Sequence, residues 1–131
     1  MTQNALHSQQ NDELLELHLA PDGEVPMIEL IGELDLSTAP KLEAMVSGRL
    51  SRSSSLVLDL SKLTFIDSSG IAVLIRAFQA TDRRGEVSFV IAPGSQVARI
   101  FSIAGIDRVL PVFLDRGAAV ERLLAETAQD A

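Results

Sequence analysis

Residues 56–70 of the chain have the sequence Leu-Val-Leu-Asp-Leu-Ser-Lys-Leu-Thr-Phe-Ile-Asp-Ser-Ser-Gly. The first part, from Leu56 to Leu60, is short and mostly apolar, which predicts a largely buried strand. From Asp67 to Gly70 the chain has an acid, two serines and a glycine, a composition typical of a helix start. The residues that follow place apolar side chains at helical spacing, at Ile71, Leu74, Ile75 and Phe78. The segment therefore predicts a strand that leads into an amphipathic helix.

The sequence before this segment predicts a hairpin and one helix. Leucines alternate with polar residues over 15–19, and residues 27–34 form a second apolar run. The Pro-Asp-Gly sequence at 21–23 favours a turn, so the two runs are expected to pair as a hairpin. A helix is expected to begin at Thr38, whose hydroxyl is a candidate cap, and to end at the serine cluster 51–55.

The sequence after this segment predicts two more strands and two more helices. The strands are expected at 87–92 and at 109–113, the second at an edge of the sheet because its proline has no N–H group to donate. Gly85 is expected to end the helix that begins at the serine pair, and Ser95 and Asp115 are candidate caps for the later helices. The terminal helix is expected to contain Val120, Leu123 and Leu124.

This order of elements, β-β-α-β-α-β-α-β-α, predicts an α/β fold. Strands that alternate with helices imply a mixed, largely parallel sheet with helices packed against it. A chain of 131 residues suits one domain. We expect that domain to occupy residues 13–126. Residues 1–12 are polar and aperiodic, and they are expected to form a flexible tail.

Composition excludes several classes of function. The net charge of −7, with no basic stripe, disfavours direct binding to nucleic acid. Cysteine is absent and the only histidines are His7 and His18, so a zinc or iron site would lack ligands and no metal or cofactor is expected. No apolar run approaches the roughly 20 residues that span a bilayer, and the N-terminus does not resemble a signal peptide. A cytoplasmic protein is the expectation.

The common catalytic motifs are also missing. There is no G-x-S-x-G sequence, no Walker phosphate loop and no histidine close in sequence to a candidate nucleophilic serine. Glu33 and Asp35 would point to the same side if their strand continued through both, and two such acids can divide acid and base roles. A solvated strand end is the simpler interpretation of this pair.

The serine pair has two competing explanations. A serine at a helix start can cap the helix for about 1 kcal/mol, but one cap needs one hydroxyl and Ser68 and Ser69 stand side by side after Asp67. A phosphate there would add about −1.5 to −2 charges, which a helix N-terminus tolerates and a protein interface does not. The interface would lose roughly 30- to several-thousand-fold in affinity. Gly70 lowers helix propensity and would offer bare backbone to an approaching protein.

At this point the sequence resembles the anti-sigma factor antagonists of bacteria, which are built on the STAS domain. The resemblance spans roughly Leu14 to Leu124. Three stretches carry it, namely Gly-Glu-Leu-Asp at 32–35, the Leu-Asp-Leu-Ser-x-Leu-x-Phe-Ile-Asp-Ser-Ser-Gly pattern at 58–70, and Ala-Arg-Ile-Phe-Ser-Ile-Ala-Gly-Ile at 98–106. Ala72 departs from the glycine that the family often has, which implies a small change in how a partner fits.

The resemblance implies a phosphorylation switch. The unmodified protein would bind an anti-sigma factor that is also a serine kinase, and this binding would release a sigma factor. The kinase would phosphorylate Ser68 and the complex would dissociate, until a metal-dependent serine phosphatase restored the hydroxyl. The chain itself would not be an enzyme. By position, the surface that contacts the partner would contain Asp35, Asp67, Ser68, Ser69, Gly70 and Ile71.

Two alternatives belong to other classes of function. STAS domains also serve as passive interaction modules in lipid-trafficking, transporter or stress-signalling assemblies, and such a module would show no dependence on phosphate at Ser68. A small enzyme that uses Asp35, Asp67 and Ser69 is the third hypothesis, and it lacks a histidine to act as the base.

Overall fold

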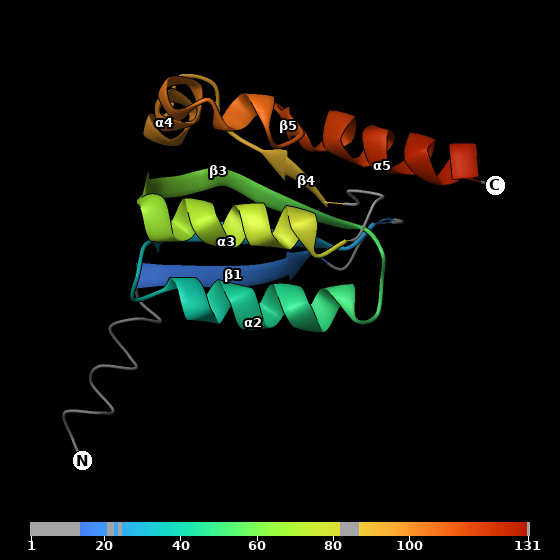
Figure 1. Ribbon diagram of the computed structural model, residues 1–131, viewed down its shortest axis with the longest axis horizontal. Coiled ribbons are helices and arrows are strands. Elements are labelled where there is room, and N and C mark those ends of the chain that lie inside the picture. Colours follow the sequence, from blue (N-terminus) through green and yellow to red (C-terminus); the bar gives the residue numbers. More distant parts are fainter. Residues whose placement is uncertain (1–13, 21–22, 24, 82–86, 131) are drawn as a thin grey trace, which may run out of the picture.

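The computed structural model describes residues 14–20, 23, 25–81 and 87–130. Within them, five strands form one sheet in the order β1-β2-β3-β4-β5. The strands are β1 (Leu15–Ala20), β2 (Met27–Leu34), β3 (Leu56–Ile66), β4 (Val87–Val90) and β5 (Val112–Phe113). The helices are α2 (Ala39–Leu50), α3 (Ser68–Gln79), α4 (Gln96–Ala104), the 3-10 turn η2 (Ile106–Arg108) and α5 (Arg116–Asp130) (Figure 1). The predicted tail, most of the 21–23 turn and the predicted helix stop at Gly85 lie outside the described residues.

The pairing of the strands confirms the predicted α/β sheet. β1 and β2 form the expected antiparallel hairpin, in which Leu17 faces Leu30. All the other pairs in the sheet are parallel, and β5 lies at the edge as predicted. The mixed, largely parallel sheet therefore places the C-terminal ends of β2 and β3 at one edge.

The length of β3 differs from the prediction. The strand was expected to end at Leu60, yet it continues to Ile66 because β2 pairs with it along that whole length. The ladder contains two register shifts, one between Glu29 and Ile31 and one between Gly32 and Glu33. Such shifts interrupt the alternation of apolar and polar residues on the strand. The second half of β3 therefore lacks the pattern that identifies a strand in sequence.

The sheet separates two hydrophobic clusters. Leu56 and Leu58 of β3 belong to the larger one, together with residues of α2, α3 and α4. Val57 lies between them and points to the opposite face, because successive side chains of a strand alternate. It joins Ala119 and Leu123 of α5 in the smaller cluster. Helices α2 and α3 consequently lie side by side on one face, while α5 packs beside β4 on the other (Figure 1).

The helix ends confirm some predicted caps and correct others. Ser95 accepts a hydrogen bond from Ala98 N at 3.1 Å and Asp115 accepts one from Ala118 N at 2.8 Å, as predicted. Thr38 occupies the N-cap position of α2, but its hydroxyl makes no capping bond because it binds the preceding loop. Helix α3 ends at Gln79, well before Gly85. The predicted terminal helix holds Val120, Leu123 and Leu124, and the side chain of Leu124 is 38% exposed.

Among the described helices, none has the length and apolar character needed to cross a membrane.

Candidate functional site

The start of α3 is capped by an acid and not by a serine. Asp67 has an extended backbone, and its Oδ1 accepts a hydrogen bond from the backbone N–H of Gly70 at 3.1 Å. The carbonyl of Asp67 accepts the next bond of the helix, from Ile71 N at 3.0 Å. The explanation of the serine pair as helix caps is therefore wrong. Both serines belong to the first turn of the helix itself.

The two serine hydroxyls are consequently not engaged in holding the fold. Ser68 is exposed and Ser69 is half-buried. Within the described part of the chain, no hydrogen bond joins either hydroxyl to another group. Their backbone N–H groups are among the free donors of the first helical turn, and the helix dipole adds positive potential there. A phosphate on Ser68 can thus be accommodated without breaking any interaction of the fold.

Gly70 has a packing role that the sequence did not indicate. It is buried, and a Cβ at this position would lie 2.8 Å from both Cγ and the carbonyl oxygen of Leu34 and 2.9 Å from Cγ1 of Ile66. On the side where a Cβ would stand, Gly70 therefore faces Leu34 and Ile66 and is not open to another protein, contrary to the prediction. The missing side chain instead lets α3 approach the ends of β2 and β3 closely.

Asp35 organises the loop that follows β2. Its Oδ1 accepts hydrogen bonds from Ser37 Oγ at 2.7 Å, Ser37 N at 3.0 Å and Thr38 N at 3.1 Å. The hydroxyl of buried Thr38 accepts from Asp35 N at 2.9 Å and donates to the carbonyl of Glu33 at 2.9 Å. The bond from the Ser37 hydroxyl is the main cause that lowers the pKa of Asp35 below its ordinary value of 3.8, and partial burial opposes it. Asp35 is thus a carboxylate that holds the loop.

The structure brings the two acids to one place. Leu34 and Ile66 are paired at the ends of β2 and β3, and Asp67 N donates to the carbonyl of Leu34 at 3.2 Å. The residues that follow these ends line one shallow hollow, formed by Asp35, Leu36, Ser37 and Asp67. We call this set together with Ser68 the strand-end surface. Ile71 lies one turn further along α3, half-buried against the core.

Glu33 and Asp35, which were considered as a possible acid–base pair, do not lie on one continuous strand. β2 ends at Leu34, so Asp35 belongs to the loop and does not continue the alternation that would align it with Glu33. Among the described residues there is also no group of three or more histidines, aspartates or glutamates arranged to hold a metal ion.

Leu36 is a candidate contact residue that the sequence analysis missed. Its side chain is 74% exposed, between Asp35 and Ser37 in the loop. The signal was a lone leucine among polar residues directly after a strand, which on its own does not distinguish an exposed side chain from a buried one.

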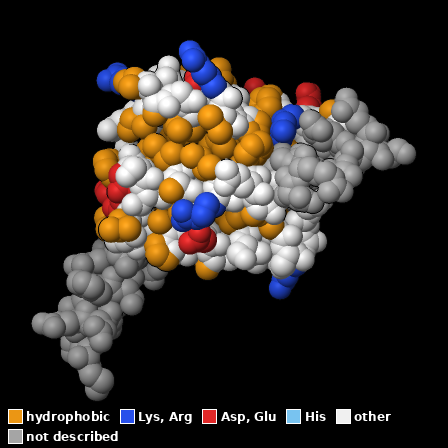
Figure 2. All heavy atoms as spheres, in the orientation of Figure 1, with side chains coloured by type: hydrophobic (Ala, Val, Ile, Leu, Met, Phe, Trp, Pro, Cys, Tyr) orange, Lys and Arg blue, Asp and Glu red, His pale blue; other side chains and the backbone are white. Residues whose placement is uncertain are grey.

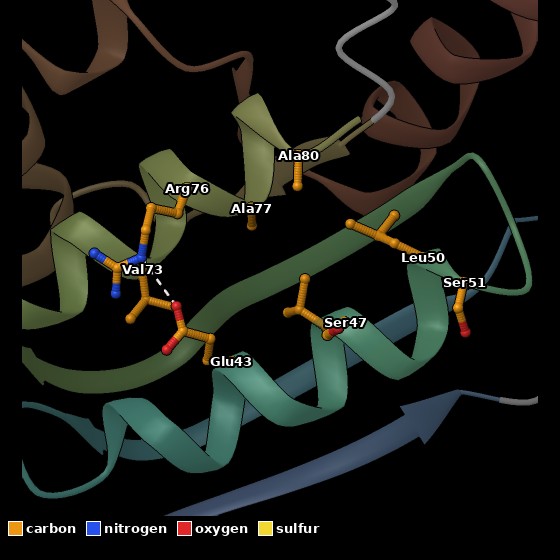
Figure 3. Close-up of a pocket in the computed structure, with 9 residues that line it drawn as sticks. Glu43, Ser47, Leu50, Ser51, Val73, Arg76, Ala77 and Ala80 are labelled. Atoms are coloured by element: carbon orange, nitrogen blue, oxygen red, sulfur yellow. Dashed lines mark hydrogen bonds and ion pairs between the residues drawn. The ribbon is translucent and has the colours of Figure 1, made fainter. Parts of the chain in front are cut away.

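A groove also runs between α2 and α3 (Figure 3). Its volume is about 410 Å³, and small or aliphatic side chains such as Ser47, Val73 and Ala77 line it. The charged groups at its rim, Glu43 and Arg76, are paired with each other at 2.9 Å. The groove lies on the flank of α3 that faces α2, so it is separate from the strand-end surface.

Comparison with known proteins gives the family that the sequence motifs resemble. The family model for the STAS domain matches residues 18–119. An anti-sigma-B factor antagonist of Listeria monocytogenes is 28% identical over 86 residues, which is 65% of this chain and 75% of that protein. An anti-sigma F factor antagonist of Paenibacillus polymyxa is 25% identical over 101 residues, which is 76% of this chain and 86% of that protein.

A solved structure agrees at the level of the fold. The crystal structure of an anti-sigma factor antagonist from Mycobacterium paratuberculosis superposes with a TM-score of 0.75 at 23% identity, covering 83% of this chain and 93% of that one. The chain belongs to the STAS domain family. Its curated relatives named above are anti-sigma factor antagonists.

Proposed function

We propose that this chain is an anti-sigma factor antagonist controlled by phosphorylation at Ser68. In its unmodified form it binds an anti-sigma factor that has serine kinase activity, and the sigma factor held by that protein is released. The kinase transfers the γ-phosphoryl group of ATP to Oγ of Ser68, with loss of the hydroxyl proton and release of ADP. A serine phosphatase later hydrolyses the phosphoserine to serine and inorganic phosphate.

The single observation that carries this proposal is the capping of α3 by Asp67. Because Asp67 binds Gly70 N, the fold does not need the Ser68 hydroxyl, which is exposed at the free end of the helix. A kinase can therefore reach the hydroxyl, and a phosphate added there does not unfold the helix. The chain acts as substrate and as competitor, and the chemistry belongs to the partner.

The charges around Ser68 explain why modification weakens binding. Asp67 precedes it, and Asp35 lies at the neighbouring strand end on the same hollow. A phosphate of about −1.5 to −2 charges would be added to this already acidic surface. A partner that covers the surface must then desolvate the new charge or lose contact, which weakens binding by at least about 30-fold.

The contact surface has an acidic part and an apolar part. Ser68, Ser69 and Asp67 stand at the helix start, while Leu36 and Ile71 supply hydrophobic contacts on either side. Asp35 contributes by shaping the loop that presents Leu36, and Gly70 contributes by seating the helix. Leu36→Ser should therefore weaken binding without altering the fold, whereas Asp35→Ala should disturb both.

Phosphorylation by the host kinase tests the proposal. Unmodified protein is used to capture partners from host lysate, and the captured kinase is incubated with ATP and either wild type, Ser68→Ala or Ser69→Ala. We expect mass spectrometry to show one phosphate on Ser68 in wild type and Ser69→Ala, and none in Ser68→Ala. Phosphate on Ser69 alone, or capture of the same proteins by unmodified and Ser68-phosphorylated baits, would contradict the switch.

A further inference from the structure

The outer face of α4 carries the most exposed large hydrophobic side chain of the described residues, and the turn after it carries another. Ile103 is 79% exposed and Val109 is 56% exposed. Arg99 lies one helical turn before Ile103 on the same face of α4, since residues four apart are neighbours on a helix. Gly105 has a left-handed backbone, with φ of 73°, which ends α4 and begins the turn that holds Arg108 and Val109. We call Arg99, Ile103, Arg108 and Val109 the α4 patch.

Two arginines stand in the α4 patch, although the chain as a whole is acidic. The net charge of the protein is −7, yet both arginines of the patch are exposed, and neither forms an ion pair within the described part of the chain. Arg76 is paired with Glu43 and Arg116 with Asp59 and Glu29, whereas exposed Arg52 has no ion pair among the described residues and no exposed large hydrophobic side chain beside it in sequence. Two free cations beside exposed aliphatic side chains favour a ligand that is acidic and apolar.

The position of the patch relates it to Ser68. Helix α4 and the start of α3 lie at the same end of the molecule (Figure 1). This follows from the topology, because α3 follows the C-terminal end of β3 and α4 follows that of β4, and these strands are parallel. Figure 2 shows hydrophobic side chains gathered between α3 and α4, below basic side chains at the upper edge of the molecule. A protein interface of the usual size buries about 800 Å² on each partner, so an interface centred on Ser68 would reach beyond the first turn of α3.

We propose that the α4 patch is a second contact surface for the kinase partner that recognises Ser68, and that it receives an acidic amphipathic segment of that partner. This inference rests on the proposed function and adds to it a contact that phosphorylation leaves intact. Ile103 and Val109 contact the apolar side of the segment, and Arg99 and Arg108 pair with its acids. A lipid surface is a weaker candidate, because anionic membranes recruit clusters of about four to eight basic residues and this patch has two.

Affinity measurements on surface variants test the inference. The probe is the purified kinase captured by the unmodified protein, titrated with full-length Ile103→Ser, Arg99→Glu and Arg108→Glu variants at low and at high salt. Leu124→Ser on α5 and Arg52→Glu in the loop between α2 and β3 are the matched controls. We expect each patch variant to lose about five- to tenfold in affinity, with the arginine effects shrinking at high salt, while melting temperatures stay unchanged.

Phosphorylation separates this inference from the proposed function. If both are correct, each patch variant binds more weakly, and the ratio of affinities between unmodified and Ser68-phosphorylated forms equals that of wild type, because separate contacts add. If the patch variants bind the kinase as tightly as wild type does, and phosphorylation of Ser68 still weakens binding, then only the assignment of the α4 patch is overturned. If unmodified and Ser68-phosphorylated wild type bind the kinase equally, then only the phosphorylation switch is overturned. Binding of wild type to phosphatidylglycerol vesicles, abolished by Arg99→Glu, overturns the assignment of a protein ligand.

Discussion

The carboxylate of Asp67 accepts a hydrogen bond from the backbone N–H of Gly70, with Oδ1 and N 3.1 Å apart. This contact fixes the first turn of α3 and leaves the neighbouring Ser68 hydroxyl without a structural role. A residue that can be phosphorylated without loss of the fold is what a binding switch requires, because the modified protein must persist until a phosphatase restores it.

Asp67→Ala should destabilise the protein by about 1 kcal/mol, because the substitution removes the N-cap of α3. For a chain of this length that is a fall in melting temperature of roughly 3–5 °C. Ser68→Ala is the matched control and should change stability by less than about 0.5 kcal/mol. Thermal unfolding of both variants checks this. If Ser68→Ala is as destabilising as Asp67→Ala, then the serine is the cap.

Gly70→Ala should destabilise the protein although alanine is the better helix former. The gain in helix propensity is about 1 kcal/mol, but the new Cβ would overlap Leu34 and Ile66, and overpacking costs about 1–3 kcal/mol. The nearest atoms include the backbone oxygen of Leu34, which has little freedom to move. Gly48→Ala in α2 is the control, since nothing lies within 4 Å of its Cβ position and it should stabilise. Denaturant unfolding of the pair measures both signs, and stabilisation by Gly70→Ala would contradict the packing.

Arg116→Met should be strongly destabilising, because Arg116 is the ion-pair partner of the buried Asp59 carboxylate of β3. Leaving a buried charge without its partner costs about 3 kcal/mol. The double variant Asp59→Asn with Arg116→Met should recover part of that loss. Arg76→Met breaks the exposed pair with Glu43 and should cost less than about 1 kcal/mol. If Arg116→Met and Arg76→Met change the free energy of unfolding equally, then the pair with buried Asp59 contributes no more than an exposed ion pair.

Ser37→Ala should raise the pKa of Asp35 toward its ordinary value, because the Ser37 hydroxyl is the main cause that lowers it. A carboxyl whose pKa is lower in the folded state stabilises the fold above its unfolded pKa. That contribution is lost as the pH falls through the folded pKa. Wild type should therefore lose more stability than Ser37→Ala on acidification below pH ~4. Carbon-13 NMR titration of the Asp35 carboxyl measures the shift directly, and an unchanged pKa in Ser37→Ala would show that the bond does not persist in solution.

The elements predicted well are those whose own residues carry the signal. The alternation over 15–19 and the apolar run at 27–34 became β1 and β2, and Ser95 and Asp115 cap the helices expected of them. Each of these features depends on contacts within a few residues along the chain or on one hairpin.

The features missed depend on neighbours far apart in sequence. β3 continues past Leu60 because β2 lies beside it, and the register shifts remove the alternation that would have identified it. At the start of α3 an acid and two serines are all good caps, so their roles are decided by which side chain faces Gly70 N. The packing of Gly70 against Leu34 likewise requires the sheet to be in place.

The affinity of the purified kinase partner for the phosphorylated protein tests the central claim most directly. Phosphoserine is installed at Ser68 and, as a control of equal charge, at exposed Ser54 in the loop before β3. The account predicts that phosphoserine at 68 weakens binding by at least about 30-fold while phosphoserine at 54 changes it less than about threefold. Equal affinity of the Ser68-phosphorylated and unmodified proteins would contradict the switch and leave a passive interaction module.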